Sequence, residues 1–369
     1  MNRGWKVVLS HDWLNGMRGG ERCLDLICKE FPEAELYTLL YRPELVSDAI
    51  RARKVHVSGL QRVPGFLNHY RWFLPLFPMA IESFRAPEGT DLVLSTSHCV
   101  AKGLVPPKGA KHLCYCFTPM RYAWTLQQDY FGRNPLKRAA LNLVLSRLRQ
   151  WDRKASARVD RFVAISHHVK ARIEQFYGRE ATVVYPPVAT QFFTPDGRGG
   201  HDGYDLVVSA LVPYKRVDLA VKAYAQTGFP LKIAGVGTKM DALRNMAAPN
   251  VEFLGRVPDE GIRELYRRCR FLVFPGEEDF GIVPLEAQAC GKPVLAFGKG
   301  GLLETVVDGK TGLFFGEQTS EALADATVRA EGVAWDPAAI RSHAEQFGET
   351  RFLEGLRAEM DRLMEGKSK

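Results

Sequence analysis

Short runs of β-branched and apolar residues alternate with helical patterns along most of this 369-residue chain. That alternation is typical of parallel α/β sheets, in which helices connect successive strands. The sequence predicts strands at residues 6–10, 91–95, 111–116, 161–165, 206–209, 231–234, 251–254, 271–274 and 293–296. It also predicts a helix over residues 135–151, where apolar residues recur at helical spacing.

Two turn-rich stretches divide the chain. Pro186-Pro187 is followed by a run of turn residues at 194–200, so we expect a domain boundary at this point. The expected domains are residues 1–186 and 187–348, each large enough for its own core. The helical pattern over 349–369 closes the second domain or crosses back to the first.

Composition narrows the class of protein. With 46% apolar and 25% charged residues the chain is globular, not disordered. Seven cysteines without paired CxxC spacing argue against a disulfide framework or a zinc site, and for reduced thiols in the cytoplasm. No apolar run is long enough to span a membrane, and the first residues read as a strand rather than a signal peptide.

Charge is distributed unevenly between the two halves. Residues 1–165 hold 25 Lys and Arg against 14 Asp and Glu, a balance of +11, whereas the remaining residues are mildly acidic. A basic first half indicates an anionic partner. Nucleic acid, a phosphorylated acceptor and an anionic membrane all fit that charge.

Residues 270–291 carry the strongest local signal. An apolar strand ends at Pro275, an acidic loop follows, and a helix is predicted with Pro284 in its first turn and Gly291 at its end. The loop therefore lies at the carboxyl end of a parallel strand, where open α/β sheets bind ligands. Free amides at residues 282–285 suit a phosphate.

Two glutamates in this segment, Glu278 and Glu286, stand eight positions apart. The first precedes the helix and the second is expected in its first turn, so they could flank a bound diphosphate. The alternative is a solvated acidic loop with a glutamate placed to suit the helix dipole.

Four segments of the chain resemble motifs of one enzyme family. The first is GEEDFGIVPLEAQACGKPV, which resembles the E-x7-E motif of retaining glycosyltransferases of family 4. The others are SALVPYKRVD at 209–218, NGMRGGE at 15–21 and VEFLGRVPDE at 251–260. More specifically, HDWLNGMRGGER, STSHCVAKG, PMRYAW and LVPYKRVDLAV are similar to a subgroup that contains bacterial O-antigen mannosyltransferases.

The resemblance implies a GT-B fold, in which two Rossmann-like domains with parallel sheets face each other across a cleft. The N-terminal domain would bind the acceptor and the C-terminal domain the nucleotide sugar. Glu278 and Lys215 would be catalytic, with Glu286 on the ribose and the backbone at Arg256 and Val257 on the base. The remaining expected donor-binding residues are Gly19, Gly20, Arg216, Phe280, Gly281, Ile282, Val283, Pro284 and Leu285.

Two positions depart from the family pattern. Ala210 stands where an arginine is usual, and Arg216 or Arg18 could replace that diphosphate ligand. Phe117 stands where the family commonly has a histidine that contacts the sugar phosphate. His98, at the end of another predicted strand, is the nearest candidate to replace it.

The acceptor side is expected in the basic half, with Arg18, His98, Arg121, Tyr122 and Trp124 as candidate residues. Residues 60–84 and 135–151 mix arginines with aromatic and aliphatic residues. Such surfaces suit the headgroup region of an anionic membrane, where a lipid-linked acceptor would lie. The alternative is that the apolar residues are core and the arginines are solvated.

The expected reaction is transfer of mannose from GDP-mannose, with retention, to a lipid-linked glycan at the cytoplasmic face of the membrane. No DxD motif occurs, so we expect neither a metal nor a resident cofactor. A UDP-sugar donor is the alternative within the same fold. A dehydrogenase is disfavoured because Met240 ends the G-x-G-x-x-G match, and a nucleic-acid-binding protein is disfavoured because no RRM, KH or zinc-finger pattern occurs.

Overall fold

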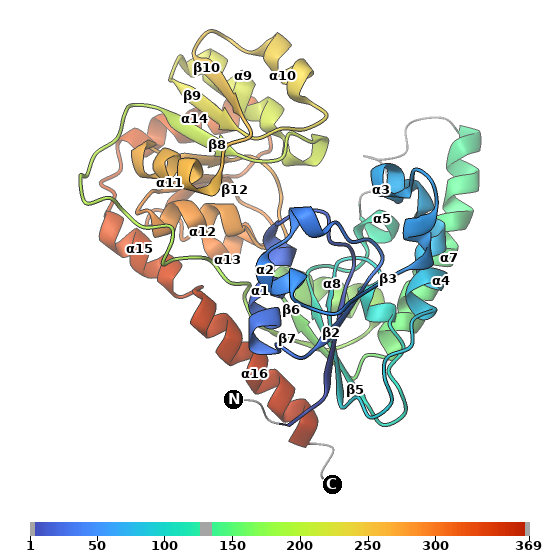
Figure 1. The fold of residues 1–369 in the computed structure, drawn as a ribbon. Coiled ribbons are helices and arrows are strands. Elements are labelled where there is room, and N and C mark those ends of the chain that lie inside the picture. The colour runs from blue at the N-terminus through green and yellow to red at the C-terminus, as the bar shows by residue number, and fades with distance from the viewer. Residues whose placement is uncertain (1–3, 126–134, 366–369) are drawn as a thin grey trace. The chain divides into compact units, whose positions relative to one another are not determined.

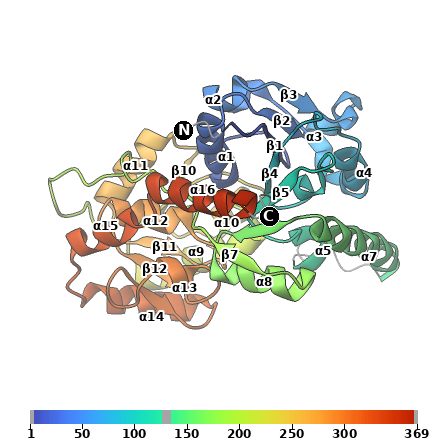
Figure 2. The same ribbon diagram turned by 90° about the horizontal axis from the view of Figure 1, so that it is seen from below.

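The structure, a computed structural model, describes residues 4–125 and 135–365. The chain forms two compact units, the first made of Met1–Pro186 with Phe352–Lys369 and the second of Pro187–Arg351. Each unit is a parallel sheet with helices packed on both faces (Figures 1 and 2). Among the described residues, no helix is both long enough and apolar enough to cross a bilayer.

The sheet of the first unit has the strand order β3-β2-β1-β4-β5-β6-β7. Its strands are β1 (Val7–His11), β2 (Glu35–Thr38), β3 (Val55–Val57), β4 (Leu92–Ser97), β5 (Lys111–Cys116), β6 (Arg161–Ala164) and β7 (Ala181–Val183). Its α-helices are α1 (Gly19–Glu30), α2 (Asp48–Arg51), α3 (Phe66–His69), α4 (Phe77–Glu82), α5 (Arg121–Trp124), α7 (Pro135–Ala157) and α8 (His167–Tyr177), and its 3-10 turns are η1 (Pro43–Leu45), η2 (Gly59–Arg62), η3 (Tyr70–Leu76) and η4 (Ala101–Gly103).

The sheet of the second unit has the order β10-β9-β8-β11-β12-β13. Its strands are β8 (Asp205–Val208), β9 (Leu231–Ala234), β10 (Val251–Gly255), β11 (Leu272–Phe274), β12 (Val294–Phe297) and β13 (Gly312–Phe315). Its helical segments are η5 (Pro213–Lys215), α9 (Val217–Thr227), α10 (Met240–Met246), α11 (Asp259–Arg268), α12 (Ile282–Ala289), α13 (Leu302–Thr305), α14 (Ser320–Glu331) and α15 (Pro337–Glu345).

The last helix, α16 (Glu349–Glu365), brings the end of the chain back to the first unit. Phe352 packs against Tyr115 of β5, with ring centroids 5.4 Å apart. Two ion pairs fasten the helix further: Arg161 to Glu359 at 2.8 Å, and Arg357 to Glu30 of α1. The first unit is therefore built from both ends of the sequence.

The strands expected from the sequence are all present, with ends shifted by no more than two residues. The sequence expectations omitted β2, β3, β7 and β13. Each of these strands is three or four residues long, and three of them, β3, β7 and β13, lie at the edges of their sheets.

A buried ion pair lies inside the first unit. Lys102 and Asp152 are 1% and 0% exposed, with Nζ and Oδ1 2.6 Å apart. The other carboxylate oxygen of Asp152 accepts hydrogen bonds from the Trp124 indole and the Tyr177 hydroxyl, each at 2.8 Å. Asp152 holds the pKa of Lys102 above its usual value, although burial alone would lower that pKa. The pair thus joins η4, α5, α7 and α8.

Lys102→Ala is expected to lower the free energy of unfolding by about 3 kcal/mol, because it leaves the Asp152 carboxylate buried without its counter-charge. Urea denaturation followed by tryptophan fluorescence measures this change. Five of the six tryptophans belong to the first unit and only Trp335 to the second, so the signal reports mainly on the unit that contains Lys102. The control is Arg329→Ala, which breaks an exposed pair with Asp325 and should change the same quantity by less than about 0.5 kcal/mol. Equal effects of the two variants would contradict the role of the buried pair.

Candidate functional site

In the second unit the expected site residues meet where the strand order reverses. β8 is the first strand of the sheet, and its neighbours β9 and β11 lie on opposite sides of it. The loop after β8 carries Lys215, and the loop after β11 carries Glu278. Because these two connections leave in opposite directions, open α/β sheets bind ligands between them.

Lys215 and Glu278 form an ion pair across this point. Their side chains are 19% and 15% exposed, so both are mostly covered but open to solvent at one side. The Lys215 ammonium also lies 5.6 Å from the ring centroid of Phe274, at the end of β11. The structure therefore brings together the two residues that the family resemblance assigned to catalysis, with their opposite charges in contact.

Arg216, the next residue, adopts a strained backbone conformation. Its φ of +52° is the one positive value found at a described residue other than glycine. Its guanidinium bonds Asp218 and the side chain of Gln318, and Gln318 in turn donates to the Pro275 carbonyl at 3.0 Å. The turn that carries Lys215 is therefore tied to the loop after β11.

The helix that follows this loop begins in the expected place. Gly281 precedes α12 with φ +110°, and a Cβ there would lie 3.2 Å from Leu302 and Thr305, so glycine is required. The Glu278 carbonyl accepts from the Gly301 amide at 2.8 Å, which holds the acidic loop against the loop after β12. The helix start at Ile282–Leu285 thus lies next to the Lys215–Glu278 pair in sequence and fold.

Glu286 lies deeper than the sequence suggested. It is the fifth residue of α12 and so falls in the second turn, not the first. Its side chain is 7% exposed and accepts a hydrogen bond from the fully buried Tyr266 hydroxyl at 3.1 Å. Burial raises the pKa of Tyr266 well above its usual value, so the hydroxyl keeps its proton and donates it to the carboxylate of Glu286 in a hydrogen bond.

The remaining donor-side residues are more dispersed. Arg256 and Val257 follow β10, the edge strand, and Arg256 is exposed. The Phe280 ring is 3% exposed and packs on Phe347, so only its backbone faces the loop. These positions share the carboxyl edge of the sheet with Lys215.

The glycine loop of the first unit also lies beside a reversal of strand order, here between β1 and β4. Gly19 and Gly20 open α1, and exposed Arg18 precedes them. A Cβ on Gly20 would lie 3.3 Å from the Phe117 ring and 3.7 Å from the His11 ring. Phe117 therefore fills the space beside the glycine loop.

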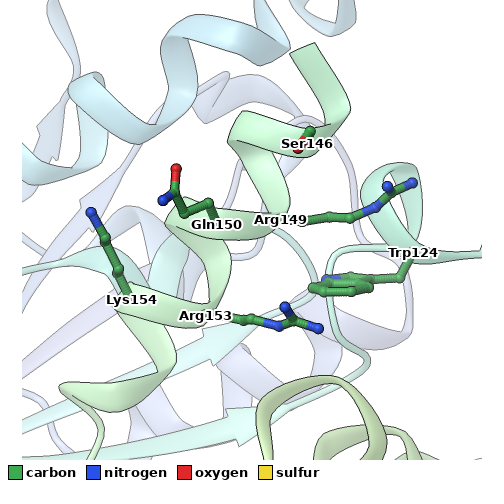
Figure 3. A pocket seen from close by; sticks show the side chains of 6 residues that line it. All are labelled: Trp124, Ser146, Arg149, Gln150, Arg153 and Lys154. Carbon is green, nitrogen blue, oxygen red and sulfur yellow. The ribbon is translucent and has the colours of Figure 1, made fainter. Parts of the chain in front are cut away.

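Three of the candidate acceptor residues belong to α5, which begins four residues after Phe117. Arg121 and Tyr122 are half-buried. The Trp124 ring stacks on Phe176 with centroids 4.7 Å apart, and Figure 3 shows Arg149 and Arg153 reaching towards it from α7. Trp124 and α7 line an open pocket of about 790 Å³, whose other residues are Ser146, Arg149, Gln150, Arg153 and Lys154. None of the described residues that line this pocket is acidic.

The sequence reasoning did not single out several side chains that hold these sites together: Asp12, Asp218, Tyr266 and Gln318. Asp12, Tyr266 and Gln318 act through partners from other elements, so no local spacing marks them, whereas Asp218 bonds Arg216 at the start of the same helix. Within residues 4–125 and 135–365, no group of three or more His, Cys, Asp or Glu side chains is placed to hold a metal ion.

Comparison with known proteins agrees with this geometry. The family model for group 1 glycosyl transferases matches residues 197–331, and the model for glycosyltransferase family 4 matches residues 17–192. The fold is that of a GT-B glycosyltransferase. The chain belongs to glycosyltransferase family 4.

Curated relatives match over part of their length. An uncharacterized glycosyltransferase of Methanocaldococcus jannaschii is 33% identical over 164 residues, which cover 43% of this chain and 46% of the relative. A GDP-mannose-dependent phosphatidylinositol monomannoside mannosyltransferase of Mycolicibacterium smegmatis is 32% identical over 178 residues, covering 40% and 47%. The chain thus spans about half the length of the curated relatives it matches.

Solved structures show the same fold. The lipopolysaccharide outer core galactosyltransferase WaaB has a TM-score of 0.67 at 16% identity, with 97% of this chain and 99% of that chain covered. The sucrose-phosphate synthase of Thermosynechococcus elongatus has a TM-score of 0.73 at 16% identity, with 96% and 98% covered. These likenesses establish the GT-B fold.

The left-handed backbone of Arg216 leads to a stability prediction. Arg216→Gly and Arg216→Ala both remove the guanidinium, so they differ only in the Cβ. We expect the glycine variant to be the more stable by about 1 kcal/mol, because a Cβ at positive φ is strained. Urea or thermal unfolding of the two variants measures the difference. A more stable alanine variant would show that the backbone leaves this conformation.

Proposed function

We propose that this glycosyltransferase moves mannose from GDP-mannose, with retention of configuration, to a lipid-linked glycan in surface polysaccharide synthesis. The observation that carries the proposal is the Lys215–Glu278 pair beside the start of α12, at the strand reversal of the second unit. A cation and free helix amides at such a point suit a diphosphate. The resemblance to O-antigen mannosyltransferases supports the choice of sugar and pathway.

The donor diphosphate would bind Lys215 and the first amides of α12, and so would release Glu278 from its ion pair. When the nucleoside diphosphate departs, negative charge grows on the phosphate that Lys215 contacts. A fixed cation and oriented amides stabilise that charge without reorganising. In this proposal no metal ion is needed for the step.

Freed from Lys215, Glu278 would accept hydrogen bonds from hydroxyls of the transferred sugar. Glu286, held by Tyr266, would bind the ribose hydroxyls through its remaining lone pairs. The backbone at Arg256 and Val257 would contact the base. In the front-face mechanism that we propose, the departing phosphate accepts the proton of the acceptor hydroxyl, so no protein nucleophile is required.

The identity of the donor is supported by the names of two relatives. The Mycolicibacterium enzyme is described as GDP-mannose-dependent, and the Neurospora crassa alpha-1,3/1,6-mannosyltransferase is 44% identical over 113 residues. A UDP-sugar is the second candidate, since the structurally similar Anabaena protein HepE was crystallised with UDP and with UDP-glucose. We favour mannose because the two mannosyltransferases are 32% and 44% identical to this chain over the matched residues, whereas HepE is 16–17% identical.

A membrane-bound acceptor is supported by an exposed apolar surface on the first unit. In η3 and α4, Trp72, Leu76 and Met79 are 80%, 42% and 65% exposed, and Leu143 of α7 is 56% exposed. The opposite side of each segment packs into a single core through residues such as Phe77 and Leu145. The basic pocket beside Trp124 adds Arg149, Arg153 and Lys154. We propose that this surface rests on the anionic cytoplasmic face of the membrane.

The enzyme proposal predicts different losses from two substitutions. Lys215→Ala should lower kcat by about 10²- to 10³-fold, as removal of one charge-stabilising donor does elsewhere. Glu286→Ala should chiefly raise the KM for GDP-mannose, because the carboxylate binds the donor alike before and during reaction. Release of GDP from GDP-mannose, with EDTA present, is the measurement.

The control for the lysine is Lys299→Ala, since Lys299 pairs with Glu277 of the same loop at 3.1 Å but is 61% exposed. It should keep its activity. A thermal-shift screen of GDP- and UDP-sugars accompanies the kinetics. If no nucleotide sugar raises the melting temperature, or if Lys215→Ala keeps full turnover, the proposal is wrong.

Membrane contact predicts that the protein floats with vesicles that contain phosphatidylglycerol, and that 0.5 M salt weakens this binding by screening the arginines. Trp72→Ser should reduce binding about tenfold, because it removes the most exposed aromatic side chain. Val328→Ser, at a 55% exposed position of α14 in the second unit, is the control and should bind as the wild type does. Salt-independent binding, or none, would contradict the membrane proposal.

A further inference from the structure

A buried carboxylate and a partly exposed imidazole meet in the first unit where its strand order reverses. Asp12 directly follows β1, and His98 directly follows the adjacent strand β4. The two residues are 86 positions apart in sequence. This is the place at which an open α/β sheet binds its ligand, and in this unit it corresponds to the place of the Lys215–Glu278 pair in the other.

The Asp12 carboxylate is anchored on every side. It is 0% exposed and accepts backbone N–H bonds from His98, Cys99, Val100 and Ala101 at 2.5–3.0 Å. Burial alone would raise the pKa of Asp12. The charge and hydrogen bonds of His98 outweigh that effect and bring this pKa well below its usual range. Four amides and one imidazole therefore hold an ionised carboxylate in a fixed position.

The His98 ring is oriented by that carboxylate. Its Nδ1 lies 3.0 Å from the Asp12 Oδ2, and the ring stands edge-on to Trp13 with centroids 4.4 Å apart. The side chain is 30% exposed, and no described residue forms a hydrogen bond with Nε2. Since Nδ1 donates to Asp12, a neutral ring carries its lone pair on Nε2.

The surroundings of the ring favour an uncharged ligand group. Asp12 is negative. Glu21 of α1 also faces His98, but burial raises the pKa of this carboxyl, and the charge of Arg18 acts on it in the opposite direction. The ring centroid of His11 lies 6.4 Å from that of His98. Burial lowers the pKa of His11 to about 4, so this second imidazole adds no positive charge near neutral pH. A hydroxyl suits such a place better than a phosphate does.

We propose that Asp12 is a positioning residue that fixes the tautomer of His98, so that His98 Nε2 accepts a hydrogen bond from a hydroxyl of the acceptor sugar. The inference rests on the proposed glycosyl transfer and adds a residue pair to its acceptor side. The competing explanation is that Asp12 and His98 only join the ends of β1 and β4.

The tautomer is measurable without any substrate. Long-range ¹H–¹⁵N spectra of the histidine rings, recorded at a pH where His98 is neutral, should show its proton on Nδ1 and none on Nε2. Asp12→Asn should remove that preference. If His98 carries its proton on Nε2 in the wild type, the proposal is overturned.

The role at the acceptor is tested by comparing two reactions of the same protein. We expect His98→Ala to reduce transfer from GDP-mannose to a synthetic prenyl-diphosphate-linked monosaccharide about tenfold, the loss expected for one hydrogen bond. Slow hydrolysis of GDP-mannose by water is recorded alongside, and transfer should fall several-fold more than hydrolysis does, because the proposed hydrogen bond is made to the acceptor. His98→Gln can place an amide oxygen near the Nε2 position and should recover most of the transfer. This variant also tests the proposal if Asp12→Asn fails to fold.

The matched control is His56→Ala. His56 also pairs with a carboxylate, Glu35 at 2.8 Å, and is 31% exposed, but it lies on β3, away from the reversal. It should leave transfer unchanged. Equal loss of transfer and hydrolysis in His98→Ala, or no rescue by glutamine, would assign the pair a structural role alone. Absence of all turnover in the wild type would instead contradict the proposed function. The tautomer of His98 could still be measured by NMR in that case, so the two failures can be told apart.

Discussion

In each unit the chain starts a sheet in its middle and then adds strands on both sides of the first one. The strand order reverses beside β1 in the first unit and beside β8 in the second. Loops that leave adjacent strands in opposite directions cannot fill the space between them, so side chains from two distant segments meet there. Lys215 meets Glu278 in this way, and His98 meets Asp12. Both candidate sites depend on this constraint.

The two pairs occupy corresponding places but differ in burial, and the difference determines what each can do. Asp12 is fully buried and held by four amides, so its partner stays in place. Glu278 is 15% exposed, and Lys215 is 19% exposed. Water reaches one side of this pair, and in the proposed function a diphosphate replaces the carboxylate on the ammonium, so Lys215 keeps an anionic partner. In the proposals made here, the first pair keeps a ring in one orientation, whereas the second exchanges partners when the donor binds.

The sequence predicted those parts of the fold and site that local pattern encodes. Nine strands and the helix with Pro284 in its first turn were identified from runs and spacing, and the resemblance to family 4 assigned Lys215 and Glu278 to one site. The buried side chains behind them were not, because Tyr266 reaches Glu286 across 20 residues and Asp12 reaches His98 across 86. The left-handed turn at Arg216 was also missed, since no glycine marks it. Tertiary partners, rather than propensity, decide such features.

The segment over residues 60–84 shows why periodicity could not separate core from binding surface. The sequence offered the two as alternatives, yet the structure contains elements of both: Leu74 and Phe77 are buried, while Trp72 and Met79 are exposed. An amphipathic segment has apolar residues on its inner face by necessity, so their presence says nothing about ligands. Large apolar residues on its outer face are the informative ones. Whether a residue lies on the inner or the outer face depends on its contacts with other elements, which the local sequence does not show.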